Sequence, residues 1–222
     1  MSFFITFEGP EGSGKTVQSQ ALYEHLRERG LSVCLTREPG GTAIGDQIRQ
    51  VLLSPENAEM LPSTEILLFS ASRAQLVGQV IRPLLEQGTI VICDRYADST
   101  LAYQGYGHGL DLDLLRAITR FATGGLRPDL IIYLDMDVEE GLRRKRETAE
   151  WNRLDRKEIA FHQRVRRGYR EMMAAEPQRW LVLDAARPFE EVREAIMARV
   201  EEAMGKWASG QVGKWASGQV GK

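Results

Sequence analysis

Short apolar runs and longer amphipathic stretches alternate along the chain. The apolar runs are continuous, which is typical of strands in a parallel sheet that is covered on both faces. They lie at residues 3–8, 31–36, 89–93, 130–134 and 181–183. The amphipathic stretches repeat their apolar residues every three or four positions and therefore predict helices. They lie at residues 15–29, 42–53, 62–88, 111–123, 165–172 and 189–200.

The order of these elements predicts one architecture. Single strands that are separated by helices pair in parallel through right-handed crossovers. We therefore expect an α/β fold with a five-stranded parallel sheet and helices on both faces. No linker interrupts residues 1–204, so we expect one domain there.

The C-terminal end has a different composition. An octad at residues 207–214 repeats without change at residues 215–222. Two short polar copies are too few for a solenoid, which needs several stacked units. We therefore interpret residues 205–222 as a flexible tail. A docking motif built on its tryptophans is the alternative.

Charge and hydropathy narrow the class of protein. The chain has 29 Lys and Arg against 31 Asp and Glu, which gives a formal net charge of −2. A near-neutral chain is a poor candidate for coating nucleic acid, so we expect no nucleic-acid partner. No apolar run approaches the ~20 residues that a membrane span needs, and the N-terminus lacks the basic region of a signal peptide. We therefore expect a cytoplasmic protein without a membrane partner.

Neither the cysteines nor the histidines predict a site. Cys34 and Cys93 each lie in an apolar run and cannot form a disulfide framework, so we interpret them as small buried residues. His25, His108 and His162 lack the spacing of metal ligands. His25 and His162 fall on predicted helix surfaces, and we assign no chemistry to any of the three.

One motif carries a specific chemistry. It matches the phosphate-binding pattern G-x-x-x-x-G-K-[ST] in full, follows a predicted strand and opens a predicted helix. Its residues are Gly9, Pro10, Glu11, Gly12, Ser13, Gly14, Lys15 and Thr16. Backbone N–H groups and the helix N-terminus bind phosphates, Lys15 reaches the β- and γ-phosphates, and the Thr16 hydroxyl binds Mg²⁺. The sequence therefore predicts a nucleoside triphosphate site with Mg²⁺, and we expect Lys15 to face solvent when no nucleotide is bound.

A P-loop by itself does not select a reaction. The chain has no guanine-reading Asn-Lys-x-Asp run and no Asp-x-x-Gly after a strand, which disfavours a GTPase switch. The near-neutral charge disfavours an ATPase that acts on nucleic acid. A kinase of a small-molecule acceptor is favoured, and a slowly hydrolysing regulatory P-loop protein is the distant alternative.

Polar side chains that suit such an acceptor follow the predicted strands, where ligands of open α/β sheets bind. Arg37 and Glu38 follow the second strand, and Asp94 and Arg95 follow the third. A second group combines aromatic rings with hydroxyl and other hydrogen-bonding side chains. Two of its members, Phe69 and Arg73, have the i, i+4 spacing that places side chains on one helix face. Its members are Phe69, Arg73, Ser99, Thr100, Tyr103 and Gln104.

Taken together, these motifs resemble the bacterial thymidylate kinase family. The resemblance is carried by the P-loop, by Arg37-Glu38-Pro39-Gly40-Gly41, by Phe69-x-x-x-Arg73 and by the run from Asp94 to Gly105. It extends from about residue 1 to about residue 204. It implies the nucleoside monophosphate kinase fold, a homodimer, and transfer of the γ-phosphate of ATP to dTMP, giving dTDP. A kinase of another nucleoside monophosphate is the nearest alternative.

The resemblance also implies contacts with the thymidine part of dTMP. Phe69 would stack on the face of the thymine, and Arg73 would donate to its O4 carbonyl. Thr100 and Gln104 would hydrogen-bond to the edge of the base. Tyr103 would lie against C2′ of the sugar and leave no room for a ribose hydroxyl.

Further contacts are implied around the sugar hydroxyl and the phosphates. Glu11 would accept a hydrogen bond from the 3′-OH. Fork-shaped guanidinium groups suit bidentate contact with a phosphate, and those implied for the acceptor phosphate are Arg95, Arg49 and Arg37. Glu38 and Asp94 would lie near Mg²⁺ and its waters, with Glu38 also among the dTMP contacts.

A basic stretch at about residues 141–157 resembles the lid of this family. Its cationic side chains are Arg143, Arg144, Lys145, Arg146, Arg153 and Arg156. In some family members a catalytic arginine lies in the P-loop beside the position of Glu11. This P-loop has no such arginine, so another part of the chain must supply the positive charge. We expect Arg153 to supply it and to act in catalysis with Lys15, Asp94 and Arg95. The alternative is a solvated basic helix face.

Overall fold

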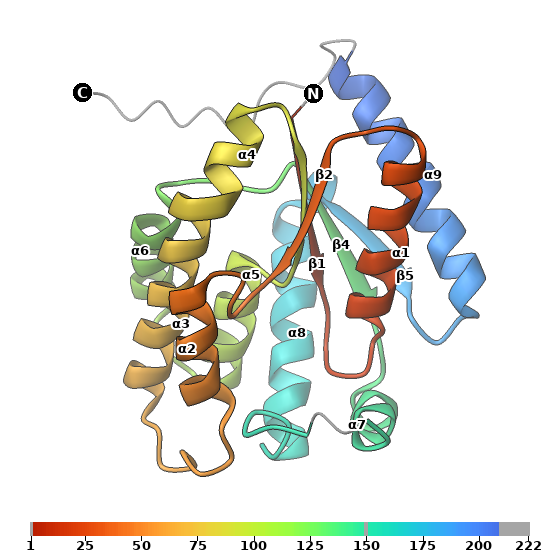
Figure 1. The fold of residues 1–222 in the computed structure, drawn as a ribbon. Helices are drawn as coiled ribbons and strands as arrows, with labels where there is room; N and C mark the ends of the chain where they lie inside the picture. The colour runs from red at the N-terminus through yellow and green to blue at the C-terminus, as the bar shows by residue number, and fades with distance from the viewer. Residues whose placement is uncertain (1, 149–150, 209–222) are drawn as a thin grey trace.

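The computed structural model describes residues 2–148 and 151–208, and a parallel β-sheet forms its centre (Figure 1). The sheet has five strands in the order β2-β3-β1-β4-β5, and every pair is parallel. The strands are β1 (Phe3–Glu8), β2 (Val33–Arg37), β3 (Ile90–Asp94), β4 (Leu130–Asp135) and β5 (Trp180–Asp184). The predicted α/β fold is therefore confirmed, and each predicted strand agrees with an observed one to within two residues.

Helices connect the strands and cover both faces of the sheet (Figure 1). The long ones are α1 (Lys15–Glu28), α2 (Ala43–Leu53), α3 (Pro62–Leu76), α6 (Leu112–Thr123), α7 (Val138–Arg146), α8 (Ile159–Ala175) and α9 (Phe189–Ala208). The short ones are η1 (Val77–Ile81), α4 (Arg82–Glu86), α5 (Ala97–Thr100), η2 (Leu101–Gly107) and η3 (Pro177–Arg179). The Thr42 hydroxyl accepts from Gly45 N at the start of α2, which is the cap that the sequence predicts.

The two faces of the sheet bury different sets of side chains. In β1, Phe3, Ile5 and Phe7 pack on one face with apolar residues of α1 and α9. Phe4 lies on the opposite face, against η1. Because side chains alternate along a strand, the even-numbered positions of β1 share that opposite face. Glu8 therefore ends β1 on the face that α8 and η2 cover.

Helix α9 is longer than the pattern of apolar residues predicts. It runs to Ala208, so residues 205–208, which were expected to begin the tail, are helical. Residues 209–222, which hold most of the repeated octads, lie outside the described residues. None of the helices that the structure describes is long and apolar enough to cross a bilayer.

Candidate active site

The phosphate-binding loop connects β1 to α1 (Figure 1), and its backbone depends on two glycines. Gly9 has a φ of +144°, and a Cβ there would lie 2.5 Å from Leu134 O. Gly12 has a φ of +69°, and a Cβ there would lie 2.0 Å from Gly141 O. Side chains at either position would collide with backbone, so only glycine lets the loop pack between β4 and α7.

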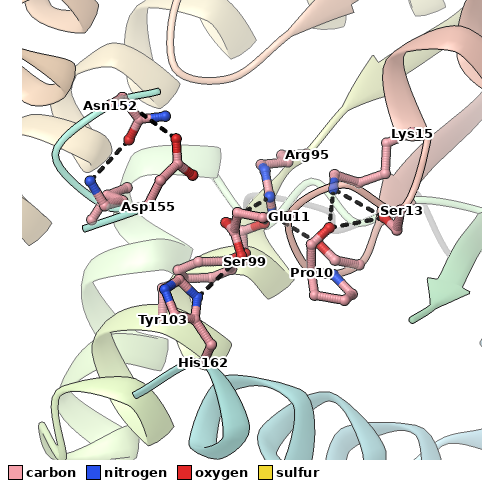
Figure 2. Close-up of polar contacts among 12 residues, drawn as sticks. Pro10, Glu11, Ser13, Lys15, Arg95, Ser99, Tyr103, Asn152, Asp155 and His162 are labelled. Atoms are coloured by element: carbon pink, nitrogen blue, oxygen red, sulfur yellow. Dashed lines mark hydrogen bonds and ion pairs between the residues drawn. The ribbon is translucent and has the colours of Figure 1, made fainter. Parts of the chain in front are cut away.

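Lys15 differs from its predicted exposure. Its side chain is buried, with only 7% of the residue exposed, and Nζ donates to Pro10 O at 2.6 Å and to Ser13 Oγ at 3.2 Å (Figure 2). Burial, with the nearby charge of Arg95, lowers the pKa of Lys15 to about 7. The expectation of a solvent-facing Lys15 was wrong because the loop curls over its own lysine and offers it a carbonyl oxygen.

Thr16 and Asp94 fit the donor set that a nucleotide-bound Mg²⁺ requires. Thr16 Oγ1 donates to Asp94 Oδ2 at 2.6 Å, although the residues are 78 positions apart in the chain. Mg²⁺ in nucleotide sites takes one or two protein oxygens and completes its shell with phosphates and water. No group of three His, Cys, Asp or Glu side chains within the described ranges is placed to hold a metal alone. The hydroxyl and carboxylate therefore suit a metal that arrives with a nucleotide.

Arg95 links the phosphate loop to the end of β3. It is the residue after β3 and has a φ of +69°, a left-handed conformation that costs a non-glycine residue on the order of 1–3 kcal/mol. Its Nη1 donates to Gly9 O at 3.1 Å, and its Nη2 donates to Glu11 Oε1 at 3.2 Å (Figure 2). Its guanidinium carbon lies 5.0 Å from the centre of the Tyr103 ring. This strained backbone holds a cation between the P-loop and η2.

Glu11 gathers side chains from three segments. Its Oε1 accepts from the Tyr103 hydroxyl at 2.6 Å, and its Oε2 lies 3.2 Å from Nδ1 of His162 on α8 (Figure 2). The prediction that His162 lies on a helix surface was wrong, because only 1% of the residue is exposed. Burial by itself would raise the pKa of Glu11, but His162 and the charge of Arg95 hold it well below the ordinary value.

Glu8 is a second buried carboxylate that the sequence analysis missed. Its Oε1 accepts from Tyr96 N at 2.9 Å. Its Oε2 accepts from Ser99 Oγ at 2.6 Å and from the Tyr169 hydroxyl at 2.7 Å. Burial and the charge of Asp98 raise the pKa of Glu8 to about 7, against these hydrogen bonds. Glu8 therefore ties α8 to the turn that carries Arg95.

This raised pKa predicts a specific pH dependence of stability. The folded chain retains the Glu8 proton up to about pH 7, whereas the ordinary carboxyl loses it near 4.5. The Glu8 contribution is therefore full below pH 4.5 and is lost as pH rises through 7, by roughly 3 kcal/mol in total. We expect Glu8→Gln to match the unchanged chain near pH 4.5 and to gain relative stability up to pH 7. Urea unfolding across this range measures the difference, and parallel curves for the two proteins would contradict it.

Arg73 on α3 contacts Thr100 within a set of residues that we term the acceptor cluster, namely Phe69, Arg73, Thr100, Tyr103 and Gln104. Arg73 is 1% exposed, its Nε donates to Glu38 Oε2 at 2.7 Å, and its Nη1 donates to Thr100 Oγ1 at 2.8 Å. Glu38 Oε1 is buried and has no hydrogen-bond partner among the residues described. An unpaired buried acceptor is costly, so this oxygen is suited to a donor on a ligand.

The other predicted acceptor residues are arranged less tightly. Phe69 on α3 is half-buried. Arg49 Nη1 donates to Pro39 O at 2.9 Å, which places this guanidinium beside the turn that carries Glu38. Arg37 is exposed and lies 3.5 Å from Asp46 in a surface ion pair. The structure thus places Arg49 beside the residue that follows Glu38 and pairs Arg37 with Asp46 instead.

Gln104 and Arg153 meet at a carboxylate that the sequence analysis did not single out. Gln104 Nε2 donates to Glu65 Oε1 at 2.8 Å. Arg153 donates through Nη2 to Glu65 Oε2 and through Nε to Leu52 O at 3.0 Å. Arg153 was expected to meet a phosphate, but in this structure its guanidinium is buried in this ion pair. A role on the phosphates would require the pair to open, and that role stays a prediction.

Three other arginines of the basic stretch, Arg143, Arg144 and Arg146, contact residues on or near α7. Arg143 contacts Glu140 and Glu147, and Arg144 contacts Glu140. Arg146 lies 5.3 Å from the centre of the Trp151 ring. The predicted lid at 141–157 thus comprises the end of α7 and the segment that leads into α8, without residues 149–150, which lie outside the described ranges.

A phosphate loop, a paired hydroxyl and carboxylate that suit Mg²⁺, and a largely buried cluster of polar and aromatic side chains accompany a five-stranded parallel sheet, and this is the fold of a P-loop nucleoside monophosphate kinase. Comparison with known proteins identifies the family within this class. The family model for thymidylate kinase matches residues 7–196. The chain belongs to the thymidylate kinase family and is an enzyme, a kinase that binds nucleotides.

Individual members of this family are similar to this chain over about 90% of its length. The thymidylate kinase of Roseiflexus sp. (strain RS-1) is 59% identical over 213 residues, covering 90% of this chain and 94% of that protein. The thymidylate kinase of Deinococcus radiodurans is 54% identical over 199 residues, covering 90% and 96%. The crystal structure of thymidylate kinase from Ehrlichia chaffeensis superposes with a TM-score of 0.73 at 35% identity, covering 90% and 98%.

Proposed function

We propose that this enzyme transfers the γ-phosphate of ATP to dTMP and releases dTDP. The observation that carries the proposal is the position of Glu11. This residue belongs to the phosphate loop, and its Oε1 accepts a hydrogen bond at 2.6 Å from the hydroxyl of Tyr103, a member of the acceptor cluster. A donor site and an acceptor site that share one residue suit direct transfer between two bound nucleotides. Phosphoryl transfer depends mainly on such positioning and on neutralising charge.

The charged groups divide between the two nucleotides. Lys15 and the backbone of the P-loop bind the β- and γ-phosphates of ATP, and Arg95 with Arg49 holds the phosphate of dTMP. Thr16 and Asp94 would hold Mg²⁺, partly through water, and the metal supplies positive charge to the phosphate oxygens. Arg153 is the further cation proposed for the transition state. Glu11 accepts a hydrogen bond from the 3′-OH of dTMP. The thymine base is contacted by Phe69, Arg73, Thr100 and Gln104.

A panel of acceptors tests this function against its alternatives. The assay supplies ATP and Mg²⁺ and compares dTMP, dUMP, dCMP, dGMP and dAMP by kcat/KM. The proposal predicts the highest value for dTMP. A higher kcat/KM for another acceptor would identify a kinase of a different nucleoside monophosphate. ATP hydrolysis that no acceptor stimulates would favour a regulatory P-loop protein.

Tyr103 gives a second prediction about the acceptor. If its ring fills the space of a ribose 2′-OH, Tyr103→Phe keeps most of the preference for deoxyribose, whereas Tyr103→Ala loses it. Because the Tyr103 hydroxyl donates to Glu11, the phenylalanine variant also loses one contact with the P-loop. The measurement is the ratio of kcat/KM for dTMP to that for its ribose analogue. An unchanged ratio in the alanine variant would assign ribose exclusion to another residue.

We also propose a cytoplasmic homodimer that does not act on nucleic acid. The net charge of −2 supports the last point. Helices α3 and α6 pack together and expose large apolar side chains, with Leu67 61%, Leu114 58% and Phe121 90% exposed. Covering such a surface with a second copy removes apolar area from water. Sedimentation tests this proposal, and a monomer at micromolar concentration would contradict it.

A further inference from the structure

Glu65 is a buried carboxylate in the first turn of α3 that neither the sequence motifs nor the proposed reaction assigns a role. Only 1% of the residue is exposed. Three side chains from two other parts of the chain surround it, namely Gln104 and His108 in and just after η2, and Arg153 before α8. Gln104 Nε2 donates to its Oε1 at 2.8 Å, Arg153 Nη2 donates to its Oε2, and Nε2 of His108 lies 3.2 Å from Oε1.

The carboxylate is ionised at neutral pH. Burial by itself would raise its pKa, but the donors around it lower the pKa of Glu65 to about 2. An ionised carboxylate only accepts hydrogen bonds. The amide of Gln104 must therefore turn its NH₂ group toward Glu65, which leaves its carbonyl oxygen Oε1 directed elsewhere as an acceptor. The charge on Glu65 thus fixes which end of a nearly symmetric amide points in each direction.

We propose that Glu65 is a positioning residue for base selection, which holds the Gln104 amide with its oxygen presented to the acceptor base. This inference rests on the proposed function, in which Gln104 contacts the edge of thymine. Thymine carries a donor, N3–H, at the centre of that edge, whereas cytosine carries an unprotonated N3, an acceptor. An amide oxygen held in this orientation accepts a hydrogen bond from thymine N3–H. It repels the lone pair on N3 of cytosine.

Arg153 completes this arrangement from the segment before α8. Its guanidinium is buried with the carboxylate, with side-chain exposures of 3% and 1%. Removing one member of a buried ion pair leaves the other charge uncompensated. Arg153 therefore keeps Glu65 ionised, so that Glu65 only accepts hydrogen bonds. The same carboxylate thus positions Gln104 and holds the segment before α8 in place.

The decisive variant is Glu65→Gln, which keeps the shape and removes the charge. A glutamine at position 65 can donate as well as accept, so the Gln104 amide is free to turn either way. We expect the ratio of kcat/KM for dTMP to that for dCMP to fall by roughly tenfold or more. The ratio of dTMP to dUMP should not change, since uracil and thymine share N3–H. An unchanged dTMP to dCMP ratio would overturn the proposal.

A matched control separates this effect from the general loss of a carboxylate. Glu24 on α1 also accepts from a glutamine amide, Gln20 Nε2, at 2.7 Å, but it is exposed. Glu24→Gln should leave both ratios unchanged. If the wild-type enzyme does not phosphorylate dTMP, the proposed function fails. If it does, and Glu65→Gln keeps its selectivity, only the present inference fails.

A double-mutant cycle shows whether Glu65 acts through Gln104. Gln104→Ala removes the amide, so adding Glu65→Gln to it should cause no further loss of selectivity. Additive losses would indicate that Glu65 acts by another route and would overturn the proposal. Thermal unfolding monitors the fold of each variant. If Glu65→Gln does not fold, Glu65→Asp, which keeps the charge and shortens the reach, must lower the same ratio for the proposal to stand.

Arg153→Ala is the third arm of the experiment. If Arg153 acts through Glu65, this variant loses dTMP over dCMP selectivity as Glu65→Gln does. A loss of kcat that is equal for both acceptors, with the selectivity ratio intact, would contradict the link between Arg153 and base selection. That second result would leave Arg153 only with its proposed role on the transferring phosphate.

Discussion

Replacing Lys15 with alanine is expected to lower kcat on the order of 100-fold or more. Negative charge moves onto the oxygens of the transferring phosphoryl group in the transition state, and Lys15 is the cation inside the loop that binds it. Burial lowers the pKa of Lys15 in the free enzyme, which disfavours its charged form there. The phosphates of ATP favour its protonated form and complete its charge when they bind.

Steady-state kinetics with saturating ATP and dTMP measure this effect. Because Lys15 is buried rather than solvent-facing, thermal unfolding must show that the variant remains folded. Lys206→Ala, which removes an exposed lysine from α9, is the control and should leave kcat unchanged. A Lys15→Ala enzyme with near-normal kcat would refute the assignment of residues 9–16 as the ATP phosphate loop.

The second large effect is expected at Arg95. Its guanidinium contacts Gly9 and Glu11 of the phosphate loop and lies over the Tyr103 ring, so it joins the two nucleotide sites. We expect Arg95→Ala to lower kcat/KM for dTMP by roughly 100-fold. Arg95→Lys keeps the charge but lacks the fork that binds a phosphate through two nitrogens, so it should restore only part of the loss.

The same kinetics with varied dTMP test this prediction. Arg29→Ala removes an arginine at the far end of α1, where it pairs with Glu201 on α9, and should leave kcat/KM unchanged. A value for Arg95→Ala within threefold of the wild type would show that Arg95 does not hold the acceptor phosphate. Full activity of Arg95→Lys would show that the charge alone suffices.

The strands and most helices follow from the sequence because their burial is simple. A strand covered on both faces needs a mainly apolar run rather than an alternating one, and β1, β3 and β4, which are buried almost throughout, are such runs. The segment of α5 and η2, residues 97–107, is different. It is helical with wider π-type turns and contains Gly105 and Gly107, so its apolar residues keep no regular helical spacing. Its motif was recognised, but its helix was not predicted.

Two of the missed residues did leave a signal. His162 precedes Val165 and Tyr169 by three and seven positions, which places it on the buried face of α8. Glu65 precedes Phe69 and Arg73 by four and eight positions on α3, so it shares the face that the sequence analysis had selected. The same periodicity that identified their neighbours places both side chains.

Other features of the site are not encoded in any local pattern. The burial of Lys15 depends on the Pro10 carbonyl oxygen turning inward, and the capture of Arg153 depends on Glu65, 88 residues earlier in the chain. The contact between Thr16 and Asp94 depends on β1 and β3 being neighbours in the sheet. Such contacts follow from the tertiary arrangement, which spacing along the chain does not reveal.

The transfer of the γ-phosphate to dTMP can be measured directly. The intact chain is incubated with Mg²⁺, dTMP and ATP that carries a radioactive γ-phosphate, and the products are separated by chromatography. The account predicts that the label appears in dTDP, one for each ATP consumed, and that consumption nearly stops without dTMP. Label that appears as inorganic phosphate at the same rate with and without dTMP would contradict it.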